Sequence, residues 1–266
     1  MAGRLRAEWR FFWALTAVNL SSAMEYRASF ISQIVGMFIN NGIYFVFWLV
    51  FIDQFGAVRG YGVDDIFLLY AIVTFGFGLG TMVAGNTGPN LAYLIAQGRL
   101  DYYLVLPRNL LLHVVFSRMS VPSIGDLTFG LVAYLFTGMF HPLDVLLFLL
   151  TSVLAGLIFV GFGIAAGSLA FFMGNAQYVS QQMSMGMVTF ALYPNGLFSG
   201  AARLLLFTLL PAAFVGAVPV TIMQTRSGWL LLGLLGAVLV VWGVATAVFY
   251  AGLRRYESGS ALNVNV

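Results

Sequence analysis

The stretch VLLFLLTSVLAGLIFVGFGIAAGSLAFFM, residues 145–173, contains no charged side chain. A bilayer core needs about 20 apolar helical residues per crossing, so this run is long enough to span a membrane. Hydrophobic residues make up 61% of the 266-residue chain and charged residues only 8%. The sequence therefore predicts an all-α polytopic membrane protein built as a single transmembrane domain. Five further runs meet or approach the spanning length: 30–51, 66–84, 120–140, 179–197 and 229–250.

The basic residues, all 12 of them arginine, indicate how these runs are oriented. With six crossings and the N-terminus in the cytoplasm, nine arginines lie inside and three outside, which is the positive-inside bias of membrane proteins. A seventh crossing within 198–220 would move two inside arginines outside, so we expect six spans with both termini cytoplasmic. The inside set is Arg4, Arg6, Arg10, Arg27, Arg99, Arg108, Arg118, Arg254 and Arg255; the outside set is Arg59, Arg203 and Arg226.

The composition also excludes several classes of protein. A phosphate-binding P-loop needs a lysine, and the chain has none, so any ATP that drives it must be bound by another polypeptide. The absence of cysteine removes thiolate metal sites, disulfides and cysteine nucleophiles. The net charge of +3 does not indicate nucleic-acid binding, because the arginines stand at the ends of apolar runs. No metal ligand set and no catalytic group assembles from the two histidines and few carboxylates.

Residues 1–28 predict a helix that lies in the membrane interface. On a helix, Trp9 and Trp13 share one face while Arg6 and Arg10 point elsewhere, a pattern typical of helices that bind the lipid surface. A cleaved signal peptide is not favoured, because the basic region contains an acidic residue and its apolar run is interrupted early. A solvated tail is the alternative.

The longest stretch predicted on the cytoplasmic side is 85–119. Asn90 can cap a helix over 91–97, and Gly98 is placed to end it in a left-handed conformation. Tyrosine and arginine are enriched at binding hot spots, so this element suits a docking surface; an interfacial helix anchored by its own tyrosines is equally consistent. The candidate docking residues are Leu91, Tyr93, Leu94, Gln97, Gly98, Arg99, Asp101 and Tyr102.

The outer segment 198–228 is apolar but interrupted by Arg203, Pro211 and Pro219. Proline ends or kinks a helix, so we expect two short helices that enter the outer leaflet and return. Backbone of this kind within a membrane must be buried in protein or line a wet cavity. The segment is therefore expected to pack against the spans. Residues 229–251 form the sixth span, and 252–266 form a cytoplasmic tail.

Polar residues within the spans are few, and they define a candidate translocation pathway. Asp126 is the one carboxylate well inside an apolar run; such groups are often proton or cation sites, but a structural pair with Arg118, about two helical turns away, is favoured. Asp144, in an outer loop, is expected to be solvated. Gly76/Gly80 and Gly163/Gly167 allow close helix packing. The other pathway candidates are Tyr178, Gln181, Gln182, Met185 and Tyr193, although methionines in spans more often serve packing.

The chain resembles the membrane subunits of type-2 ABC exporters, in particular a bacterial branch of paired permeases. The resemblance rests on Gly98-Arg99-Leu100-Asp101, leading through Leu104 to Pro107, on Ala191-Leu192-Tyr193-Pro194, and on Pro211-Ala212-Ala213-Phe214 with Val218-Pro219. It implies a dimeric transmembrane unit in the bacterial inner membrane, formed with a related permease or a second copy. It also implies an ABC ATPase, which binds ATP and Mg²⁺ and docks under the short cytoplasmic helix over 91–97, the coupling helix of this family.

Three functional classes are consistent with these observations. The first is a non-catalytic permease subunit that exports hydrophobic or amphipathic compounds, such as drugs or lipids, with a separate ATPase. The second is an ion-coupled secondary transporter that uses Asp126, although such proteins usually have several ionisable groups at the bilayer midplane and repeated halves. The third, an intramembrane enzyme, lacks a catalytic constellation.

Overall fold

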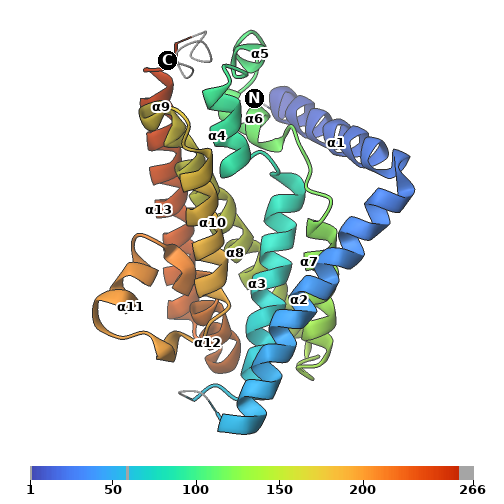
Figure 1. Cartoon of the computed structure of the whole chain (residues 1–266), viewed down its shortest axis with the longest axis vertical. Coiled ribbons are helices and arrows are strands. Elements are labelled where there is room, and N and C mark those ends of the chain that lie inside the picture. The colour runs from blue at the N-terminus through green and yellow to red at the C-terminus, as the bar shows by residue number, and fades with distance from the viewer. Residues whose placement is uncertain (1, 58–59, 258–266) are drawn as a thin grey trace.

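The computed structural model describes residues 2–57 and 60–257, with side chains from Ala14 onward. Within those residues the chain folds into helices joined by loops, with no β-strand. Figure 1 shows an elongated bundle of long helices, with short helices gathered at its two ends. The prediction of an all-α membrane protein is confirmed.

Four apolar helices are long enough to cross a membrane: α2 (Arg27–Phe55), α3 (Val63–Val83), α8 (Pro142–Ser168) continued by α9 (Ala170–Met173), and α13 (Gly228–Leu253). A bent pair in the outer segment would make a fifth. The count of six crossings stays a prediction, because two of the runs form shorter helices, α7 (Ser123–Leu135) and α10 (Gln177–Ala191). At 1.5 Å per residue each is about 20 Å long, less than the ~30 Å hydrocarbon core.

The core of the bundle is built around α3, which packs between α7 and α8. The helices approach closely because small residues face each other. A Cβ added to Gly76 of α3 would lie 2.6 Å from the carbonyl oxygen of Ser152, and one added to Gly156 of α8 would lie 2.5 Å from that of Gly76. The Gly76/Gly80 pair therefore serves the tight packing predicted for it.

Helix α1 (Ala2–Glu25) lies across the end of the bundle that carries α4 (Pro89–Ala96) and α6 (Leu110–Phe116) (Figure 1). The chain then bends at Tyr26 and enters α2. Among the described side chains of α1, Asn19 holds this helix there through a hydrogen bond from Nδ2 to the carbonyl oxygen of Ser117 at 3.2 Å. The side chains of Arg6, Trp9, Arg10 and Trp13 lie outside the described residues, so the interfacial role stays a prediction. Helix α13 ends at this same end of the bundle (Figure 1), as an even number of crossings requires.

The outer segment forms short elements that fold back on the bundle: η1 (Asn195–Leu197), α11 (Gly200–Phe207), η2 (Pro211–Phe214) and α12 (Ala217–Thr225). The chain bends by 61° between α11 and the η2–α12 stretch. Most of η2 and α12 is buried, whereas α11 is largely exposed. The expected packing against the bundle is therefore found for the η2–α12 half of the hairpin, whereas α11 does not pack in this way.

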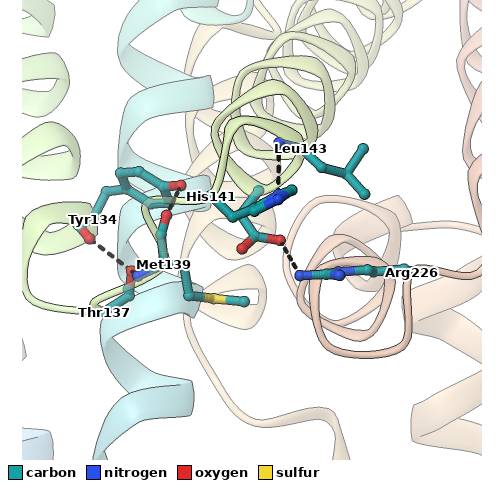
Figure 2. A network of polar contacts seen from close by, with 7 residues as sticks. Tyr134, Thr137, Met139, His141, Leu143 and Arg226 are labelled. Atoms are coloured by element: carbon teal, nitrogen blue, oxygen red, sulfur yellow. Dashed lines mark hydrogen bonds and ion pairs between the residues drawn. The ribbon is translucent and has the colours of Figure 1, made fainter.

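Polar contacts attach this hairpin to the outer end of α8. Arg226, which ends α12 in a left-handed conformation, donates a hydrogen bond from Nη2 to Asp144 Oδ1 at 2.9 Å (Figure 2). Beside it, the Tyr134 hydroxyl donates to the Met139 carbonyl oxygen at 2.5 Å. The expectation that Asp144 is solvated is wrong. Its side chain is buried, and Arg226 at the end of α12 pairs with it.

Candidate functional site

The short helix α4 and the turns around it are sharply defined by backbone geometry. Gly88, with φ +55°, precedes the helix, and Pro89 occupies its first position. Gly98, with φ +68°, ends it, and the amides of Gly98 and Arg99 donate to the carbonyl oxygens of Ile95 and Leu94 at 3.1 and 2.9 Å. This is a Schellman motif, and the predicted role of Gly98 is confirmed.

The expected role of Asn90 as the N-cap is wrong. The helix begins two residues earlier than predicted, because proline suits the first helical position, where its fixed φ is already helical and a backbone N–H would have no partner within the helix. Asn90 lies inside the first turn, and its Nδ2 donates to the carbonyl oxygen of Gly85 at 2.8 Å. Its side chain therefore braces the loop that enters α4.

Helix α4 divides the predicted docking residues between two faces. Leu91 is fully buried, Leu94 is half-buried, and both pack in the apolar cluster between α4 and α8. A Cβ added to Gly167 of α8 would lie 2.8 Å from the Leu91 Cβ, so the absence of a side chain there makes room for α4. Leu91 thus holds the helix in place and is not available to a partner.

The opposite side of α4 and the residues that follow it form a surface that we call the docking surface: Tyr93 of α4, Gln97 and Arg99 just after it, and Tyr102 of the short helix α5 (Asp101–Leu104), with Asp101 at its edge. The first four are exposed, Tyr102 at 69% of its area. The Arg99 guanidinium carbon lies 5.1 Å from the centre of the Tyr93 ring, within the range of a cation–π interaction. An arginine and a tyrosine are therefore already paired, the tyrosine on α4 and the arginine in the turn that ends it.

The chain end after α13 completes this surface, which sequence patterns did not indicate. The Tyr256 hydroxyl donates a hydrogen bond of 3.0 Å to Asp101 Oδ1, and burial, together with this contact to Asp101, raises the pKa of Tyr256 to about 12. Arg255 stands over the Phe172 ring at 5.2 Å. Between α4, α9 and this chain end lies a groove of about 160 Å³ lined by Ile95, Ala96, Ala170, Phe171, Gly174, Arg255, Tyr256 and Glu257.

A larger cavity of about 310 Å³ lies on the other side of α4, within the bundle. Met37 of α2 lines it together with side chains of α3, α7, α8 and α10. Its wall includes three of the predicted pathway residues: Asp126, Gln181 and Met185. The loop and first turn of α4, with Gly88, also contribute. The same short helix therefore carries the docking surface and borders the cavity.

Among the described residues of this cavity wall, Asp126 is the one ionisable side chain. It is 2% exposed, and its Oδ1 accepts a hydrogen bond of 2.7 Å from Nδ2 of Asn41 on α2. Its Oδ2 is buried and has no hydrogen-bond partner. The favoured pairing with Arg118 is wrong: that side chain is exposed, and an amide from a neighbouring helix holds the carboxylate instead.

Comparison with protein families identifies the family of this chain. Residues 38–260 match the family described as ABC-2 family transporter protein. The chain belongs to the ABC-2 transporter family. It is thus a membrane permease of an ABC transporter, a kind of subunit that is generally non-catalytic and works with an ABC ATPase. Comparison with curated proteins and with solved structures gave no match.

In this ABC-2 permease, the exposed side of α10 differs from that of α13. It presents Tyr178, Gln181, Gln182 and Met185, whereas α13 presents leucines and valines, as a lipid-facing helix does. Polar side chains within a membrane usually face protein or a wet cavity. Tyr193 is set apart from this group, because its ring packs edge-on against Trp48 at 5.2 Å.

Proposed function

We propose that this chain forms half of the translocation pathway of an ATP-driven exporter and that a separate ATPase docks on the surface around α4. The observation that carries the proposal is the position of α4. Tyr93 of α4 and the following Gln97 and Arg99 are exposed, while Gly88 and Pro89 at the start of the helix line the cavity. At eight residues, or about 12 Å, the helix is short enough to move as one body.

In this mechanism, ATP and Mg²⁺ bind to the ATPase, and the permease converts the movement of that subunit into a change of cavity shape. A push on the docking surface is passed through Leu91 to α8, since the two are packed without a gap. It also reaches α10, because a Cβ at Gly88 would lie 2.8 Å from Ser184 Oγ. Close-packed interiors transmit such displacements with little compression.

The pathway is proposed to be completed by a second permease, either a related chain or a second copy. The polar exposed side of α10 supports this, because it is poorly suited to lipid and well suited to a shared, partly wet interface. The apolar wall of the cavity, with Phe77, Phe159 and Met187, favours a hydrophobic or amphipathic substrate. We place the complex in a bacterial inner membrane, with both termini in the cytoplasm.

Co-expression with candidate P-loop ATPases tests the proposal. The isolated permease should hydrolyse no ATP, since it lacks the lysine of a P-loop, and should recover one ATPase when purified by a tag. Substrate efflux from proteoliposomes should then require ATP. Specific ATPase activity from the isolated chain, or efflux driven by an ion gradient without ATP, would contradict it; the second result would instead favour an ion-coupled transporter that uses Asp126.

A further inference from the structure

The wall of the largely apolar cavity contains a buried carboxylate, that of Asp126. A buried carboxylate is costly unless it is paired and its oxygens accept hydrogen bonds. Asn41 satisfies Oδ1 at 2.7 Å, while Oδ2 has no partner. The cavity wall therefore includes one strong acceptor that a neighbouring helix holds in position, and the buried Oδ2 atom of this carboxylate has no hydrogen-bond partner among the described residues.

The surroundings of this acceptor restrict what the donor can be. Phe77 and Phe159, whose ring centres are 5.1 Å apart, and Phe162 line the same cavity, so the cavity offers aromatic faces as well as one carboxylate. A metal ion is not favoured, because no group of three or more histidine, cysteine or carboxylate side chains among the described residues could hold it. An organic cation with an apolar body satisfies both parts, because an ammonium can donate to the carboxylate and lie against an aromatic ring.

Size and access are consistent with a small ligand. The volume of about 310 Å³ is at the lower end of the range of about 300–1,000 Å³ for ligand pockets. The wall includes Gln181 and Met185 from the exposed side of α10, so the cavity reaches the side of the bundle that carries the polar residues. Its border with Gly88 and Pro89 of the α4 region puts a bound molecule next to the helix of the docking surface.

We infer that the cavity between α2, α7 and α10 is a binding site for hydrophobic amines, with the ammonium group held by Asp126 and the apolar body held by the phenylalanine and methionine side chains. This inference rests on the proposed function and names the substrate class. Asn41 is a positioning residue, since it fixes the carboxylate through Oδ1 and leaves Oδ2 for the ligand.

The test measures equilibrium binding to the purified full-length permease in nanodiscs of zwitterionic lipid, with empty nanodiscs subtracted. The probes share one aromatic body and differ in charge: 1-naphthylmethylamine, 1-naphthalenemethanol and 1-naphthylacetate. The wild type should bind the amine more tightly than the alcohol or the carboxylate. In Asp126→Asn this preference should disappear, with amine binding weakened by about tenfold to a hundredfold, as expected for a lost charged hydrogen bond.

Asp144→Asn is the matched control, because Asp144 is also a buried carboxylate but is paired with Arg226 at the outer end of the bundle. It should keep the amine preference. A second measurement needs no variant: the amine should protect Asp126 of the wild type from a hydrophobic carbodiimide, and the alcohol should not, as read by mass spectrometry.

Equal binding of all three probes, no binding, or an unchanged preference in Asp126→Asn would overturn the inference. Recovery of the ATPase is scored separately on the same preparations. An intact ATPase complex without amine preference would contradict only the proposed substrate class. Amine preference without any ATPase partner would contradict the proposed function but support the amine-binding site.

Discussion

The hydroxyl of Tyr256 and the carboxylate of Asp101 are joined by a hydrogen bond of 3.0 Å, although the two residues lie 155 positions apart. This bond ties the end of the last long helix to the turn that follows α4. It therefore holds the edge of the docking surface against the residues that follow α13.

Tyr256→Phe removes this bond and should lower the free energy of unfolding by about 1 kcal/mol. The pKa of Tyr256 is raised to about 12, above its ordinary value of about 10, so the stabilisation is fully present below pH 10 and is lost as the pH rises through 12. The difference in melting temperature between variant and wild type should thus be the same at pH 6 and pH 9. A difference that shrinks across that interval would contradict this assignment.

Arg99→Ala combined with Asp101→Ala should abolish recovery of the ATPase at equal permease abundance. Removing charged contacts that a partner buries costs about 2–5 kcal/mol, whereas loss of solvated surface charges costs far less. Tyr256→Phe is the control, because it breaks the internal bond to Asp101 and keeps both charges. If the double variant retains wild-type recovery and efflux, the surface around α4 is only a membrane anchor.

Accessibility of tags tests the topology. Tags at residues 1 and 266 should both be protected from protease added outside intact cells, while a tag next to Gly60 should be cleaved, because the arginine distribution places the two termini inside. Termini on opposite faces would rule out an even number of crossings. The measurement requires that tagged chains reach the membrane in normal amounts.

Gly156→Ala should destabilise the bundle by about 1–3 kcal/mol, since the added methyl group would lie 2.5 Å from the carbonyl oxygen of Gly76 on α3. Gly233→Ala in α13 is the matched control. A methyl group there meets nothing within 4 Å, and alanine favours a helix over glycine. Its melting temperature should be unchanged or higher, and equal losses in the two variants would show that the close approach of α3 and α8 contributes no stability.

Long-range contacts mark the limit of what the sequence could predict. Apolar run length identified the long helices, and the position of Gly98 identified the end of α4, because both signals are local. The hydrogen-bond partner of Asp126 is Asn41, which is 85 residues away on another helix. The sequence suggested Arg118 instead, because that residue is near Asp126 in the chain. The contact of Tyr256 with Asp101 left no local pattern at all, and Asp144 was misjudged because its cover, α12, is distant in the sequence.

The ion pair between Arg226 and Asp144 also bears on how the chain is made. The two residues are 82 positions apart, so at about 5–20 residues per second of synthesis the carboxylate exists for about 4 to 16 seconds before its arginine. In the folded chain Asp144 lies in the first turn of α8, where the helix dipole favours a negative charge even without the arginine. The outer end of the bundle can thus assemble in two stages, with the hairpin closing last over a carboxylate already in place.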